Sequence, residues 1–351
     1  MSLSIGIVGL PNVGKSTLFN TLTKNKAEAS NYPFCTIDPN VGVVKVPDKR
    51  LYKIAEISKP KKIIPATIEF VDIAGLVKGA HKGEGLGNKF LSNIRECDAI
   101  CEVVRQFKDD NITHVHNKIN PDDDKETINL ELIFADLQTI EKKIIKTEKE
   151  AKSGDKKAIK EKNLFYKIKE KLDSGQPARL TELDEEEEII IKRLQLLTTK
   201  PIIYVLNTDD NSEKINNWDG EIINLNVKTE EEIANLDKKE QEEFIKELGL
   251  EQSGLDKLIQ ASYKLLGLIS FFTTGKDETR AWTIKKETKA PQAAGVIHTD
   301  FEKGFIRAEV INFKDFIEQK GETSAREKGL IHAEGKDYIM QDGDICNFLV
   351  N

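Results

Sequence analysis

Residues 9–16 carry the clearest chemistry in this chain of 351 residues. Gly9 and Gly14 are separated by four residues and followed by Lys15 and Ser16, the spacing of a phosphate-binding loop. Glycines let the backbone curl and direct N–H groups at a phosphate, supported by the N-terminus of the following helix. Lys15 would neutralise the β- and γ-phosphates, and the Ser16 hydroxyl would bind Mg²⁺. We expect nucleotide contacts from Asn12, Val13, Gly14, Lys15, Ser16 and Thr17.

Three further residues would complete a site for Mg²⁺ and a triphosphate. Asp72 ends an expected strand, where its carboxylate can hold a Mg²⁺-bound water, and Gly75 can offer its N–H to a γ-phosphate. Thr36 lies where a mobile loop could bring a second hydroxyl to the metal. Asp-x-x-Gly alone is a common turn, but its pairing with residues 9–16 favours a sensor of bound triphosphate.

Asn207 and Asp210 follow another expected strand, where this class of nucleotidase recognises the base. In the guanine-binding form, Asn-Lys-x-Asp, the carboxylate accepts from guanine N1–H and the 2-amino group. Adenine has an acceptor at N1 and no 2-amino group, so a carboxylate matches it poorly. Thr208 replaces the lysine here, so this motif leaves the base open.

Short strands and helices must position these residues. Apolar runs predict strands of an open parallel α/β sheet at 5–8, 63–72, 99–104 and 200–207, with a helix at 16–24 after the phosphate-binding loop. Apolar residues spaced three and four apart over 130–144, and again over 165–172, predict an antiparallel helical hairpin. Because the strand pattern resumes at residue 200, we expect the hairpin to be an insertion in the nucleotide-binding domain.

The remaining C-terminal part predicts a small module. Residues 263–272 are apolar enough for a packed helix and an exit segment. Beyond residue 275 the chain is strand-rich, with expected strands at 281–284, 306–311 and 337–344. We interpret this part as an α+β module with its own core.

Composition limits the partners. The net charge of −7 argues against passive coating of nucleic acid or an anionic membrane. The sequence shows no targeting signal and no apolar run of ~18 residues, and its four scattered cysteines lack metal-ligand spacing. We therefore expect a cytosolic protein without membrane contact. Lysines on the hairpin could contact RNA phosphates, although a solvated helix face is the commoner meaning of such a run: Lys156, Lys157, Lys160, Lys162, Lys167, Lys169 and Lys171.

Over essentially its whole length the sequence resembles the Obg-like ATPase (YchF-type) family of translation-factor-class P-loop NTPases. The resemblance is carried by residues 9–17, 31–36, 70–80, 83–88, 280–283 and 290–307. It implies a P-loop NTPase domain with an inserted antiparallel helical coil and a C-terminal β-grasp (TGS) domain. The boundaries we expect are 1–127 and 199–274 for the nucleotide-binding domain, 128–198 for the hairpin and 275–351 for the TGS domain.

The resemblance also implies roles for residues outside the common motifs. Leu76 stands where Ras-like enzymes carry the glutamine that orients the attacking water. A histidine on a mobile loop takes that role in the family, which matches His114; His116 and an exposed loop histidine without a role are the alternatives. Asn12 suits a K⁺-binding position. Cys35 matches a cysteine of the switch loop, consistent with oxidation sensitivity or with an ordinary buried residue.

The activity implied by the resemblance is a slow, Mg²⁺-dependent nucleotide switch acting on ribosomes or ribosomal subunits. The family's base motif usually ends in Glu, whereas this chain has Asp210, so we expect ATP to be favoured and GTP to bind appreciably. A nucleotide-regulated stress-response binding protein with incidental hydrolysis is the alternative. A metabolic enzyme is disfavoured because no acceptor pocket or further acid–base pair stands out.

Overall fold

The computed structural model describes residues 3–24, 40–73, 86–115, 118–209 and 215–351. Thr36, Gly75 and Asp210 lie outside these ranges, as do Cys35, Leu76 and His116. The chain forms two compact units. The first is drawn from Met1–Lys24, Asp38–Gly42 and Phe70–Leu255, and the second from Val43–Glu69 and Asp256–Asn351.

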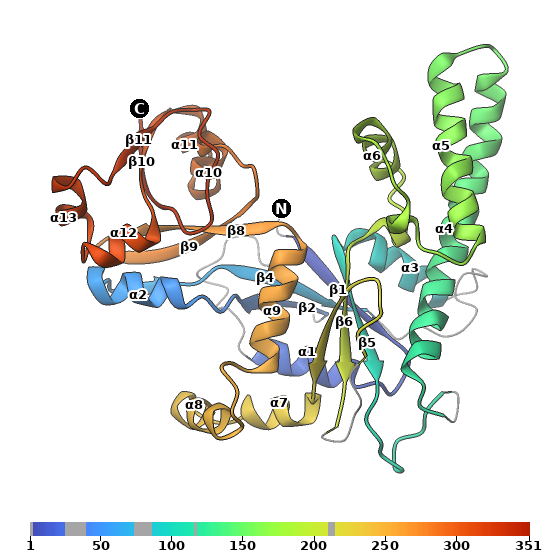
Figure 1. The fold of residues 1–351 in the computed structure, drawn as a ribbon, viewed down its shortest axis with the longest axis horizontal. Coiled ribbons are helices and arrows are strands. Elements are labelled where there is room, and N and C mark those ends of the chain that lie inside the picture. Colours follow the sequence, from blue (N-terminus) through green and yellow to red (C-terminus); the bar gives the residue numbers. More distant parts are fainter. Residues whose placement is uncertain (1–2, 25–39, 74–85, 116–117, 210–214) are drawn as a thin grey trace. The chain divides into compact units, whose positions relative to one another are not determined.

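A six-stranded sheet has the order β2-β4-β1-β5-β6-β7 (Figure 1). Its strands are β1 (Ser4–Gly9), β2 (Val41–Lys45), β4 (Thr67–Asp72), β5 (Ala99–Arg105), β6 (Ile202–Asn207) and β7 (Glu221–Leu225). The neighbours β1, β5, β6 and β7 pair in parallel, and β5 and β6 are buried along their whole length. Continuous apolar runs are typical of parallel strands covered on both faces, which confirms the predicted parallel α/β sheet.

The helices of this part are α1 (Lys15–Lys24), α3 (Leu86–Glu96), α4 (Pro121–Ala151), α5 (Lys156–Asp173), α6 (Glu185–Lys192), α7 (Val227–Ile233) and α8 (Lys238–Glu247), followed by α9 (Gly254–Leu265). Two short 3₁₀ helices, η3 (Ala178–Leu180) and η4 (Leu197–Thr199), lead from the hairpin to β6.

Helices α4 and α5 form the predicted antiparallel hairpin, side by side in Figure 1. The two helices share one apolar core, made by Ile133, Ile140, Ile144, Leu164, Phe165, Ile168 and Leu172, with Leu137 packed against it. The turn between them ends at Asp155, whose side chain accepts from Lys157 N and caps α5. Helix α4 begins at Pro121, earlier than predicted, because proline fits the first turn of a helix.

The second sheet is mixed and has the order β11-β10-β12-β8-β9-β3. Its strands are β3 (Lys62–Ile64), β8 (Leu268–Thr274), β9 (Glu278–Lys285), β10 (Phe305–Ile311), β11 (His332–Glu334) and β12 (Ile345–Val350). The second unit also holds α2 (Lys49–Ser58), α10 (Ala290–Ile297), α11 (Thr299–Lys303), α12 (Phe313–Glu318) and α13 (Glu322–Glu327).

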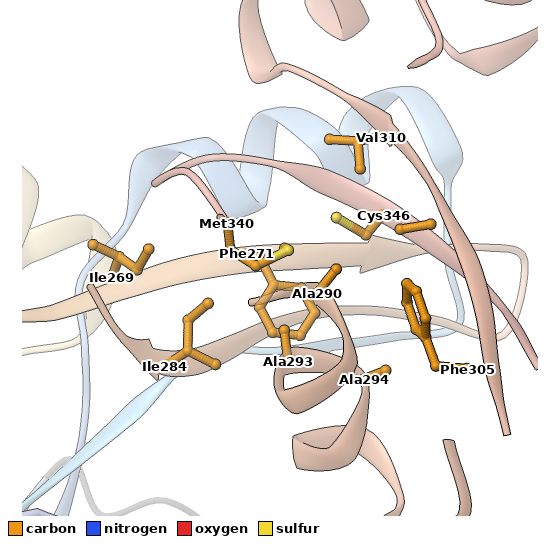
Figure 2. Close-up of a cluster of buried hydrophobic side chains, with 11 residues drawn as sticks. Ile269, Phe271, Ile284, Ala290, Ala293, Ala294, Phe305, Val310, Met340 and Cys346 are labelled. Atoms are coloured by element: carbon orange, nitrogen blue, oxygen red, sulfur yellow. The ribbon is translucent and has the colours of Figure 1, made fainter. Parts of the chain in front are cut away.

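Figure 2 shows the core of this C-terminal part, where Phe271 of β8 faces Ala290 and Ala293 of α10. All three residues are fully buried, and the alanines let the helix lie close to the sheet. Cys346 and Met340 complete the same cluster. A mixed sheet with a helix packed across it is the arrangement of a β-grasp domain, as the resemblance implied.

Three local predictions were wrong. The run 63–72 is not one strand, because Pro65 interrupts it: β3 joins the second sheet and β4 the first. In 263–272 the helix ends at Leu265 and strand β8 follows. Residues 337–344 form turns with a single bridge from Ile339 to Lys289, and Gly343 has a φ of +99°. No helix within the described ranges is both long and apolar enough to cross a membrane.

Candidate nucleotide-binding site

The phosphate-binding loop lies between the end of β1 and the start of α1, at the carboxyl edge of the parallel sheet. Asn12 and Gly14 have φ angles of 65° and 94°, so the loop curls through the left-handed region. A Cβ on Gly14 would lie 2.4 Å from Asn207 Nδ2, and one on Gly9 would lie 2.7 Å from the carbonyl oxygen of Val103. Both glycines are therefore required by conformation or close approach.

Lys15 and Asp72 form an ion pair beside this loop. Lys15 opens α1 and is largely buried, while Asp72 ends β4 and keeps part of its side chain accessible. The pair brings together two residues predicted separately from distant parts of the sequence. It leaves a cation and a carboxylate at the loop, the charges that phosphates and a metal ion require.

The residues present fit Mg²⁺ held jointly with phosphates. Ser16 is exposed in the first turn of α1, next to Lys15, and Asp72 offers carboxylate oxygens. Mg²⁺ prefers such hard oxygen ligands and is usually bound by one or two protein groups together with substrate phosphates. Among the described residues, no group of three His, Cys, Asp or Glu side chains could hold a metal without other ligands.

Asn207, predicted to contact the nucleotide, joins the loop to the rest of the sheet. Its Nδ2 donates to the Val13 carbonyl at 2.9 Å, and its Oδ1 accepts from Val227 N at 3.2 Å. The side chain is buried at the carboxyl end of β6. Both ends of the amide thus bind protein groups, and the residue fixes the phosphate-binding loop against the start of α7.

His114 is buried, so the interpretation as an exposed loop residue is wrong. Its Nε2 lies 2.8 Å from Asp124 Oδ2, in the first turn of α4. The preceding residue, Thr113, accepts a hydrogen bond of 3.1 Å from Asn12 Nδ2 through its carbonyl. The histidine segment therefore contacts the phosphate-binding loop through Thr113 and the hairpin through His114.

Sequence reasoning missed the groups that hold this segment, Asp124 and Arg105. Arg105 is buried at the end of β5 and donates to the carbonyls of Phe107, Asp109 and Ile112. An arginine directly after the apolar run 99–104 was the available signal, because a charged group there must find partners when the strand is buried. Asp124 gave no signal, since it stands among the acidic residues that open many helices.

A second buried group lies along β5, at Glu102. Burial raises the pKa of its carboxyl well above the ordinary range, a shift that Lys125 and Arg179 partly offset. Within the part of the chain that the structure describes, neither carboxyl oxygen has a hydrogen-bond partner. Arg179 and Lys125 both pair with Asp219, the latter with Nζ at 3.3 Å from the carboxylate. The four ionisable side chains come from β5 (Glu102), α4 (Lys125), η3 (Arg179) and the segment before β7 (Asp219).

A parallel α/β sheet with a glycine-containing loop before its first helix, and a lysine–aspartate pair beside that loop, defines a P-loop nucleoside triphosphatase. Residues 4–136 match the family described as "50S ribosome-binding GTPase", and residues 268–351 match YchF-GTPase_C, described as "Protein of unknown function (DUF933)". The chain belongs to the YchF family.

Relatives match it over the full length. It is 54% identical to "Ribosome-binding ATPase YchF" of Bacillus subtilis and 53% identical to the protein of that name from Escherichia coli O157:H7, with all of each chain covered. The structure of the Schizosaccharomyces pombe YchF GTPase superposes with a TM-score of 0.88 at 40% identity, over 99% of this chain and 98% of that one.

Proposed function

We propose that this protein is a Mg²⁺-dependent ATPase that works as a slow nucleotide switch and binds ribosomes or ribosomal subunits. The observation that carries the proposal is the phosphate-binding loop with Lys15 paired to Asp72. The full-length relatives are named as ribosome-binding ATPases, which supports both the reaction and the partner. A ribosome partner fits the cytosolic location expected from the sequence.

The phosphate-binding loop would hold the nucleotide through backbone N–H groups of residues 12–17, with Lys15 on the β- and γ-phosphates. Lys15 would exchange Asp72 for phosphate, which frees the carboxylate for the metal. Ser16, Asp72 and Thr36 would hold Mg²⁺, which supplies charge neutralisation at the phosphates when bound. Gly75 would donate its N–H to the γ-phosphate, so that loss of this phosphate releases the switch.

Hydrolysis needs a group that orients the attacking water, and the side chain of Leu76 has no hydrogen-bonding atom for this. We propose His114 for the role, after a change from the buried position described above. Asn12 would hold K⁺ near the β–γ bridge through its side-chain oxygen, while its nitrogen donates to the Thr113 carbonyl. Turnover without a partner would be slow because His114, in its buried position, does not contact the attacking water.

Base recognition falls mainly to Asp210, since both ends of the Asn207 amide bind protein groups. We propose that ATP is favoured and that GTP also binds. Calorimetric titration of both nucleotides with Mg²⁺ and K⁺ tests this directly. Tighter GTP binding would mean that Asp210 still recognises guanine and that the chain is a GTPase.

We also propose that different parts of the chain bind the nucleotide and the partner. Residues 1–127 and 199–274 would bind nucleotide, while the hairpin at 128–198 and the TGS domain at 275–351 would report its state to the partner. RNA contact through the hairpin belongs to the same proposal, because exposed lysines lie around its tip.

Replacement of Lys15 tests the site itself. We expect Lys15→Ala to abolish nucleotide binding or turnover, because it removes the cation from the phosphates. Binding is measured by calorimetry and turnover by phosphate release, with Lys24→Ala at the far end of the same helix as the control. Wild-type binding and turnover in Lys15→Ala would refute the assignment of the loop.

A further inference from the structure

His114 and Asp124 tie the segment after β5 to the first turn of α4. Their side chains are 5% and 3% exposed, and the Nε2–Oδ2 distance is 2.8 Å. On the other side of this contact, Asn12 Nδ2 donates to the carbonyl of Thr113. The residue next to His114 in sequence is therefore bonded to the phosphate-binding loop, whereas the ring of His114 itself is bonded to helix α4.

Arg105 fixes the earlier part of the same segment. Its guanidinium donates to three carbonyls, at 3.2 Å to Phe107, 3.2 Å to Asp109 and 3.0 Å to Ile112. It also lies 4.3 Å from the centre of the Phe107 ring. The segment is thus a formed structure that directs His114 into the protein.

We propose that Asp124 is a positioning residue that holds His114 away from the attacking water until α4 moves. The proposal rests on the water-orienting role proposed for His114. A histidine in that role must offer a ring nitrogen to the water, and here Nε2 is taken by Asp124. Because both groups are buried, separating them would leave each without this bond, so release is disfavoured without a compensating change.

The first turns of α4 hold a second loop as well. Asp122 Oδ1 accepts from Trp218 Nε1 at 2.8 Å, and Lys125 Nζ lies 3.3 Å from Asp219. Trp218 and Asp219 belong to the segment between β6 and β7, downstream of the expected base motif. A displacement of this helix end therefore strains both loops together, and a partner that shifts the hairpin would release His114.

Turnover of Asp124→Asn is the main test, because this change keeps the side-chain volume and removes the charge. The amide oxygen can still accept from the imidazole, but more weakly than the carboxylate does. We therefore expect partner-free kcat to rise about three- to tenfold, the scale of the difference between a hydrogen bond to a charged group and one to a neutral group, with unchanged nucleotide Kd. Stimulation by ribosomes should shrink by a similar factor. Asp123→Asn is the matched control: it removes the same charge from the same helix turn, at an exposed position, and should behave as wild type.

Modification of His114 by diethyl pyrocarbonate, followed by mass spectrometry, tests the contact without relying on turnover. Wild type should react slowly at His114 and Asp124→Asn faster, while thermal unfolding shows that both are folded. A lower kcat in Asp124→Asn would overturn the proposal, because Asp124 would then orient His114 for catalysis. Unchanged kcat and unchanged modification would overturn it too.

His114→Ala separates this proposal from the proposed function. Unchanged turnover in His114→Ala would remove the histidine from the reaction, whatever its rate of modification. Slower turnover in His114→Ala, combined with wild-type behaviour of Asp124→Asn, would leave the function standing and reject only the role of Asp124. The double variant should hydrolyse at the rate of His114→Ala, because releasing an absent imidazole has no effect.

Discussion

At the scale of single residues, the site depends on a few buried polar groups whose partners come from other elements. Asn207 secures the phosphate-binding loop with both ends of one amide, and Gly14 leaves the space that this amide occupies. A buried amide with both ends bonded is costly to disturb, because each lost bond leaves a desolvated group. The loop is therefore shaped before nucleotide arrives, which lowers the ordering cost of binding.

Glu102 gives a prediction for stability at the same scale. Burial raises the pKa of its carboxyl in the folded state, whereas in the unfolded chain the pKa is ordinary. The folded state thus keeps its proton to higher pH, so stability is lost as pH rises from the ordinary pKa towards the folded one. Glu102→Gln cannot ionise, and we expect its Tm to exceed that of wild type by a margin that grows with pH.

Thermal unfolding between pH 5 and 9 measures this margin. Glu126→Gln, a change to an exposed carboxylate of α4, is the control and should follow the wild-type curve. A Tm difference that stays constant across this range would contradict the expected titration of Glu102.

At the scale of elements, the hairpin combines an apolar seam with an uneven distribution of charge. Several of its lysines are paired with carboxylates: Lys160 with Glu186, Lys167 with Glu187, and Lys169 with Asp173 and Glu141. Exposed lysines also surround the turn at its tip, namely Lys149, Lys152, Lys156 and Lys157. The tip is therefore the part of the hairpin best suited to phosphate contacts.

The triple change Lys152→Glu, Lys156→Glu and Lys157→Glu tests this charge. We expect weaker ribosome association, and a slope of log K against log salt whose magnitude is smaller by about 2 to 3, if each lysine meets one phosphate. Nucleotide binding should not change. The same change at Lys238, Lys239 and Lys246 of α8 is the control, and equal losses in both variants would indicate a general effect of net charge.

Sequence patterns predicted elements well where burial follows a simple period. The strands β1, β5 and β6 and the hairpin seam are continuous or regularly spaced apolar runs, so local sequence determines them. Pairing over long distances was not predictable in this way: β3 and β4 are separated by only Ala66 and Pro65, yet they join different sheets. The His114–Asp124 contact was missed for the same reason, because the spacing of apolar residues does not indicate which polar partner a buried side chain contacts.

At the scale of the whole molecule, two compact units with separate cores should respond differently to ligand. The residues proposed to bind nucleotide, where the structure describes them, all belong to the first unit. A ligand that binds only the folded state stabilises it by about 2.7 kcal/mol at a concentration a hundred times Kd. We expect two thermal transitions. Mg²⁺ with a non-hydrolysable ATP analogue should raise the Tm of only one of them, that of the first unit.

Differential scanning calorimetry with and without the analogue measures both transitions. Lys15→Ala should show the same two transitions and no shift on adding the analogue. One transition that moves as a whole would mean that the units unfold cooperatively.

In the pairing of β3 with β9, Lys62 lies opposite Glu278. During translation, Lys62 is synthesised long before Glu278. Strand β3 and helix α2 leave the ribosome early, but their sheet cannot form until the C-terminal strands have been synthesised. Leu51 and Ile54 of α2, buried in the finished protein, must wait through that interval without their final neighbours. A chain that stops at residue 255 would therefore keep this apolar surface exposed, so premature termination would yield a target for chaperones and proteases rather than a trimmed but usable nucleotide-binding unit.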